Sequence, residues 1–92
     1  MKLTIEDLRE YAKMDVITRH TDRGKEIRQE LNERMRWMPM RWRRIVRCRY
    51  IMGMSILRTS MELNISKASV TRGTREIARW LVDTDKYLEE QV

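Results

Sequence analysis

The hydrophobic pattern of this chain is helical, because apolar residues recur at three- and four-residue intervals and no segment shows sustained strand alternation. Thr4 is a suitable N-cap for a first helix, which we expect to end before the polar stretch 20–24. A second helix follows and ends at Pro39, unless Pro39 opens the next helix. Its apolar face consists of Ile27, Leu31, Met35 and Met38.

A third helix is expected between Pro39 and Gly53, a residue type that commonly ends helices. Arginines lie largely off its apolar stripe, which consists of Trp42, Ile45, Cys48 and Met52. We expect the tryptophans of this region, Trp37 and Trp42, to belong to the core. The arginines are expected to remain in solvent.

Residues 55–81 have the spacing of a helix-turn-helix. Ser55 and Ser66 can each cap a helix, and Asn64 suits a left-handed turn position between the two helices. We expect Ile65 to insert into the core. The inward-facing side chains of the first helix are expected to be Ile56, Ser60 and Leu63. A short helix and a three-residue turn set the next helix across the first, where its N-terminal side chains can enter a major groove. An ordinary helical hairpin with a solvated polar face is the alternative.

Positive charge surrounds this motif. The chain has 92 residues, a net charge of +6 and an isoelectric point of about 10.0, which favours a polyanionic partner. From Arg34 to Arg79 the only acids are Glu62 and Glu76, whereas residues 1–33 are close to neutral. Seven arginines lie between residues 34 and 49 and can neutralise phosphates beside the motif. We therefore expect double-stranded DNA as the partner.

Other classes of protein find little support in the residues. The single cysteine, Cys48, and the single histidine, His20, give no metal site and no intrachain disulfide. No nucleophile–base pair or phosphate-binding glycine loop is visible, so we expect neither an enzyme nor a cofactor. No apolar run has transmembrane length and no secretory signal is visible. These features favour an intracellular, cytoplasmic protein without a membrane partner; if the chain is a DNA-binding regulator, it would belong to the bacterial nucleoid or to a phage-infected cell.

Several runs of residues resemble the tryptophan repressor family. Residues 68–74 read Ala-Ser-Val-Thr-Arg-Gly-Thr, residues 44–46 read Arg-Ile-Val, and residues 87–90 read Tyr-Leu-Glu-Glu. The resemblance covers roughly residues 41–92. It implies a repressor that forms an intertwined homodimer, with two reading heads about one DNA turn apart on a palindromic operator. Spacing and resemblance together give a set of candidate DNA-contacting residues: Arg58, Lys67, Ala68, Ser69, Thr71, Arg72, Thr74 and Arg75.

The resemblance also implies a corepressor pocket, which this sequence keeps only in part. Arg72 and Gly73 are kept, whereas Trp42 stands where the family has a second arginine and Glu76 where it has a serine. Glu76 could hold the ammonium group of tryptophan or a related corepressor, with Arg41 or Arg43 replacing the lost arginine. Alternatively, the ring of Trp42 fills the space and holds the reading head without a ligand, which is the hypothesis we favour.

We therefore expect one all-α domain over residues 1–92, with roughly six helices. Residues 1–53 would hold the dimerisation and basic helices, residues 54–81 the helix-turn-helix, and residues 82–92 a C-terminal helix. Because 37% of the residues are charged, a second copy of the chain is expected to complete the core. An architectural or phage packaging DNA-binding protein, or a basic protein-interaction module, would share these features.

Overall fold

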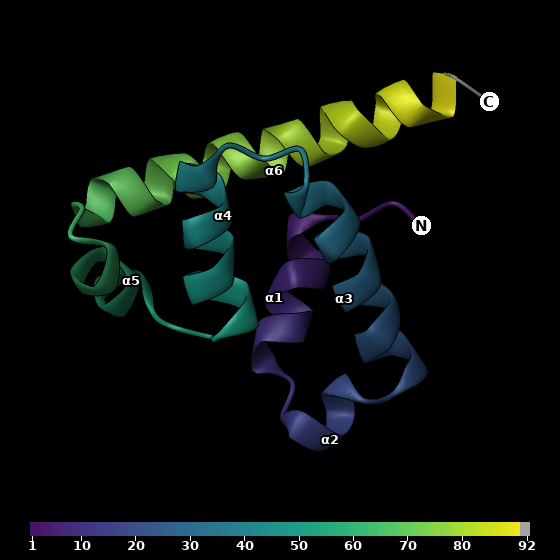
Figure 1. Ribbon diagram of the computed structural model, residues 1–92, viewed down its shortest axis with the longest axis horizontal. Helices are drawn as coiled ribbons and strands as arrows, with labels where there is room; N and C mark the ends of the chain where they lie inside the picture. Colours follow the sequence, from purple (N-terminus) through teal and green to yellow (C-terminus); the bar gives the residue numbers. More distant parts are fainter. Residues whose placement is uncertain (91–92) are drawn as a thin grey trace.

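The structure, a computed structural model, describes residues 1–90 and the side chains of residues 1–84. It confirms the all-helical class, with six α-helices and one π-helical segment in the described part of the chain (Figure 1). The elements are α1 (Ile5–Lys13), α2 (Val16–Arg19), α3 (Asp22–Met35), α4 (Met40–Val46), η1 (Arg47–Ile51), α5 (Ile56–Leu63) and α6 (Lys67–Glu90). The π-helical η1 continues α4 with a wider turn.

Side-chain caps start the helices of the N-terminal half. The backbone N–H of Asp7 donates to the Thr4 hydroxyl (3.2 Å), and the Thr4 N–H donates to the Asp7 carboxylate (2.9 Å), so the two residues form a capping box. The single helix expected before residue 20 is wrong: α1 ends at Lys13, and Asp15 caps the separate short helix α2. The stretch 20–24 is also shorter than expected, because α3 already begins at Asp22.

The core lies where α1, α3 and α4–η1 meet, and α6 lies along one edge of this group (Figure 1). The expected apolar faces are buried at most of their positions, including Ile27, Leu31, Met35, Met38, Ile45 and Cys48. Met52 is an exception at 60% exposed, and it lies at the end of η1 next to Gly53, which has a φ of +67° and ends the helix as predicted.

Trp37 is not a core residue. Its side chain is 79% exposed, because it lies in the turn between α3 and α4, where the neighbouring Met38 occupies the buried position. The separate C-terminal helix expected at residues 82–92 is also wrong: α6 runs without a break from Lys67 to Glu90. No glycine or proline lies between residues 81 and 90 to end it. Residues 91–92 lie outside the described residues.

Candidate nucleic-acid interface

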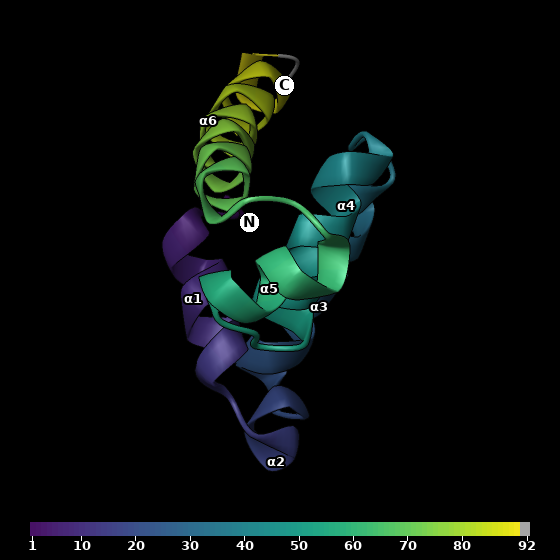
Figure 2. The ribbon, with the colours of Figure 1, turned by 90° about the vertical axis from the view of Figure 1, so that its left-hand side faces the viewer.

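The segment from α5 to α6 consists of two helices joined by a three-residue turn, as the caps and the turn residue predicted. The Ser55 hydroxyl accepts the N–H of Arg58 (3.0 Å), and the Ser66 hydroxyl accepts the N–H of Ser69 (3.0 Å), so both predicted caps are confirmed. Asn64 adopts the left-handed conformation (φ 54°, ψ 46°) and ends α5. This turn sets α5 against the first part of α6, and Figure 2 looks onto the end of the molecule where both lie.

The contact between α5 and α6 uses smaller side chains than the pattern suggested. Ser60 is buried as predicted, and its hydroxyl donates to the carbonyl of Leu57 (2.7 Å). Thr59 and Val70 are fully buried beside it. The predicted insertion of Ile65 is wrong: its side chain is 38% exposed and lines a cavity instead. Ile56 shares the face of α5 that carries Thr59 and Ser60, but it lies in the first turn of the helix and stays 36% exposed.

Most of the candidate DNA-contacting residues on α6 share one face of the helix. At about 100° per residue, positions 67, 68, 71, 72 and 75 fall within an arc of about 140°. Lys67, Ala68, Arg72 and Arg75 are exposed, and Thr71 is half-buried among them. Arg79, which sequence reasoning missed, is exposed on the same arc. The helical spacing alone could have identified it.

Two candidates lie off that face. Thr74 lies just outside the arc, beside the buried Val70; it is half-buried, and its hydroxyl donates to the Val70 carbonyl (2.9 Å). Ser69 is half-buried, and its hydroxyl accepts a hydrogen bond from Ser66 (2.9 Å). The remaining candidate, Arg58, is exposed on α5. The exposed face therefore carries Lys67, Ala68, Thr71, Arg72, Arg75 and Arg79.

The four residues expected around a ligand pocket meet between α4 and α6. Trp42, Arg72, Gly73 and Glu76 line a cavity of about 260 Å³ together with Arg41, Ile45, Ile65 and Ser69. The indole N–H of Trp42 donates to the Glu76 carboxylate (3.2 Å), which also lies 4.0 Å from the Arg41 guanidinium. The Trp42 ring meets Trp80 edge to face, with 6.0 Å between ring centroids. The indole N–H of Trp42 on α4 therefore has its hydrogen-bond acceptor on α6, in the carboxylate of Glu76.

The arginines of residues 34–49 fall into two groups that the sequence did not separate. Arg43 and Arg49 donate to backbone carbonyls, Arg43 to Met38 (3.0 Å) and Arg49 to Met54 (2.6 Å). Arg34 is buried and ion-paired with Glu30 (2.7 Å). These three arginines therefore stabilise the fold. The exposed members of the block are Arg36, Arg41, Arg44 and Arg47.

Three other features bear on the kinds of site that the described residues contain. Cys48 is buried as expected, and this burial raises the pKa of its thiol, so the reactive thiolate is scarce at neutral pH. Within residues 1–84 the structure brings no three metal-ligating side chains together. None of the helices it describes combines the length and the apolar character needed to cross a membrane.

Comparison of the chain with protein-family models, with curated proteins and with solved structures finds no match.

Proposed function

We propose that this protein is a sequence-specific, double-stranded DNA-binding transcriptional regulator that reads a palindromic site as a homodimer. The observation that carries the proposal is the junction of α5 and α6. A left-handed Asn64 and a Ser66 cap leave the first turns of α6 exposed, with cationic and small polar side chains on one face. An α-helix presented in this way fits the major groove. The role as a repressor comes from the resemblance alone.

The side chains on that face match the chemistry of a duplex. Lys67, Arg72 and Arg75 can contact phosphates or guanine edges, and Thr71 can donate to or accept from a base. Ala68 can contact a thymine methyl group. Helix α5 has one acid, Glu62, which lies toward η1. The acid in the first turns of α6 is Glu76, whose carboxylate accepts a hydrogen bond from Trp42. The exposed face of α6 therefore offers donors without a carboxylate among them.

Exposed apolar side chains support a homodimer. Several apolar residues are more than half exposed in the single chain, among them Val16 and Ile17 on α2, Leu57 and Met61 on α5, and Val82 on α6. Leu57 and Met61 are four residues apart and therefore lie on one side of α5. Adjacent exposed apolar side chains such as Leu57 and Met61 commonly mark a contact surface. A second copy of the chain is the partner we propose.

Selection of binding sites from random duplex DNA with the purified protein tests the proposal, and a short palindrome is expected. Lys67→Ala/Thr71→Ala is expected to weaken binding to the selected site by tenfold or more, since a base contact contributes about 1–3 kcal/mol of discrimination. The matched control, Lys13→Ala/Thr84→Ala, removes the same residue types elsewhere and is expected to bind normally. Strong binding without sequence preference would instead favour an architectural role. If low-salt titration shows no DNA binding, the proposal is wrong.

A further inference from the structure

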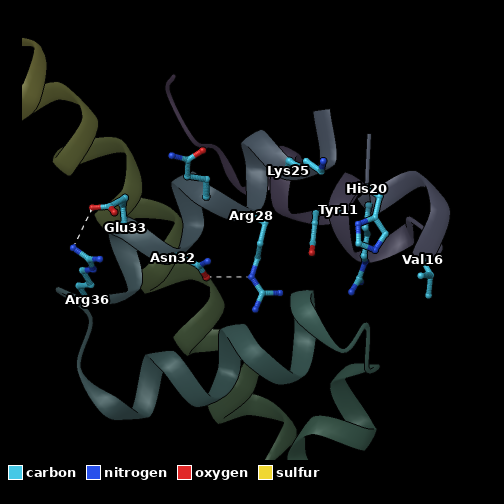
Figure 3. Close-up of a pocket in the computed structure, with 10 residues that line it drawn as sticks. Tyr11, Val16, His20, Lys25, Arg28, Asn32, Glu33 and Arg36 are labelled. Atoms are coloured by element: carbon cyan, nitrogen blue, oxygen red, sulfur yellow. Dashed lines mark hydrogen bonds and ion pairs between the residues drawn. The ribbon is translucent and has the colours of Figure 1, made fainter. Parts of the chain in front are cut away.

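A second cavity lies between α2 and the outward face of α3, away from the α5–α6 junction (Figure 3). Its volume is about 540 Å³, within the range of roughly 300–1,000 Å³ in which proteins bind small ligands. Four guanidinium or ammonium groups line it, from Arg19, Lys25, Arg28 and Arg36, against the single carboxylate of Glu33. We refer to it as the α3 cavity.

The positive charges of the α3 cavity are mostly uncompensated. Glu33 is ion-paired with Arg36 (3.6 Å). Within residues 1–84, no carboxylate lies within ion-pairing distance of Arg19, Lys25 or Arg28. Like charges held beside one cavity repel one another, and a bound anion relieves that repulsion.

Two of these cations are already held in place. The Arg19 guanidinium donates to the carbonyl of Ile51 (2.6 Å) and lies 4.4 Å from the centre of the Tyr11 ring. The Arg28 Nε–H donates to the Asn32 side-chain oxygen (3.1 Å), which leaves the terminal nitrogens of that guanidinium without a protein partner. Figure 3 shows the Arg28 guanidinium and the Tyr11 hydroxyl extending to the same side. A fixed guanidinium with free terminal N–H groups matches the two oxygens of a phosphate.

We propose that the α3 cavity binds phosphate groups, with Lys25 and Arg28 as the direct contacts. Three of the lining residues, Lys25, Arg28 and Asn32, recur at three- and four-residue intervals on one face of α3, and Arg36 follows at the C-cap of the helix. Several phosphate oxygens can therefore be contacted at once. The phosphates belong either to a free polyphosphate or to the backbone of a nucleic acid. The site shares no residue with the exposed face of α6, so it goes beyond the proposed function.

Isothermal titration calorimetry with inorganic tripolyphosphate and with a short oligothymidylate tests this inference on the full chain. Lys25→Gln/Arg28→Gln removes the two direct contacts. Arg9→Gln/Lys13→Gln removes the same two residue types from α1, where both are exposed and lie outside the cavity and the exposed face of α6, and is the matched control. We expect the cavity variant to bind at least one ligand roughly tenfold more weakly than the parent, since hydrogen bonds to charged groups contribute about that factor. Circular dichroism and thermal melting confirm that both variants are folded.

The two ligands distinguish the sources of the phosphate. A loss confined to tripolyphosphate assigns the cavity to a free polyphosphate, and a loss confined to oligothymidylate assigns it to a nucleic acid backbone. The inference is overturned if both variants lose affinity equally, which is the result of general charge alone, or if neither ligand binds the parent. Selection of a duplex site addresses the exposed face of α6 separately, so either proposal can fail without the other.

Discussion

At the scale of single residues, Gly73 fixes the distance between α6 and α4. A Cβ atom built on Gly73 would lie 2.6 Å from the Cδ1 atom of Ile45, which is buried in the core. Glycine inside a helix costs about 1 kcal/mol relative to alanine. The close approach of the two helices therefore gives a physical reason for glycine in the run 68–74, whether or not a ligand enters the adjacent cavity.

A double-mutant cycle measures this contact. Gly73→Ala is expected to lower the free energy of unfolding of the parent by about 1 kcal/mol, because overpacking outweighs the gain in helix propensity. Ile45→Val removes the Cδ1 atom, so in that background the same substitution is expected to raise the free energy of unfolding by up to about 1 kcal/mol. Urea denaturation gives the four values. An equal effect of Gly73→Ala in both backgrounds would show that Ile45 does not set the distance.

Asp7 links the first helix cap to the stability of the fold at acid pH. Partial burial alone would raise the pKa of Asp7, but hydrogen bonds from Thr4 and Arg23 outweigh it and hold that pKa below its usual value of 3.8. The Arg23 guanidinium lies 2.7 Å from Asp7 and 2.8 Å from Glu10. Because the folded state has the lower pKa, the stabilisation is complete above the unfolded value and disappears as the pH falls through the folded value.

Asp7→Asn is therefore expected to lower the free energy of unfolding at pH 7 by about 1 kcal/mol, a typical contribution of a helix cap. The difference between parent and variant should shrink as the pH falls below 3.8. Urea denaturation across the pH range measures it. The control is Glu6→Gln, which breaks the exposed pair between Glu6 and Arg9 and should change stability by less than about 1 kcal/mol. A difference for Asp7→Asn that is independent of pH would contradict the assignment.

At the scale of elements, Trp42 and Glu76 join α4 to α6 beside the proposed DNA-contacting face. The indole N–H of Trp42 and the carboxylate of Glu76 satisfy one another, and Trp80 packs edge to face on the Trp42 ring. The Glu76 carboxylate, which a ligand's ammonium would use, already accepts this one hydrogen bond. The Trp42 ring does not fill the whole space, because a cavity of about 260 Å³ remains beside it. That Trp42 takes the place of a corepressor therefore stays a prediction.

Calorimetry with free tryptophan tests that hypothesis. No heat is expected from the parent, and binding to the selected DNA site should not change when tryptophan is added. The matched variant is Trp42→Arg/Glu76→Ser, which introduces the residue types that the resemblance implies for a corepressor pocket, and heat is expected only there. DNA binding by the parent that requires tryptophan would show that Trp42 does not replace the ligand.

The elements differ in how far the sequence determines them. Capping residues and the left-handed turn act within a few residues, so Thr4, Ser55, Asn64 and Ser66 were predictable from local sequence. Whether an apolar side chain is buried depends on its neighbours in space, so Trp37 and Ile65 were assigned wrongly.

The candidate sites divide in the same way. The exposed face of α6 follows from the 3.6-residue repeat once its start at Lys67 is known. The α3 cavity combines residues of α3 at helical spacing with Tyr11 of α1 and Arg19 of α2. The spacing on α3 can be read from the sequence, but only the packing of α1 and α2 against α3 adds Tyr11 and Arg19.

At the scale of the whole molecule, the proposed DNA binding would depend on the exposed arginines of the whole chain. The chain measures 41 × 31 × 19 Å, so one copy reaches only a short length of duplex. Its net charge of +6 favours nucleic acid without selecting a sequence. Two copies on a palindrome would double both the number of phosphate contacts and the number of base contacts. The dependence of binding on salt can therefore report the stoichiometry.

Arg75→Gln provides this measurement. Each phosphate that a protein neutralises contributes about 0.9 to the slope of log affinity against log salt concentration. If a homodimer uses Arg75 from both protomers, the substitution should reduce the slope by about 1.8, whereas a monomer would lose about 0.9. Lys13→Gln removes an exposed charge from α1 and should leave the slope unchanged. An unchanged slope for Arg75→Gln would remove Arg75 from the interface, because a charge that meets no phosphate releases no counterion.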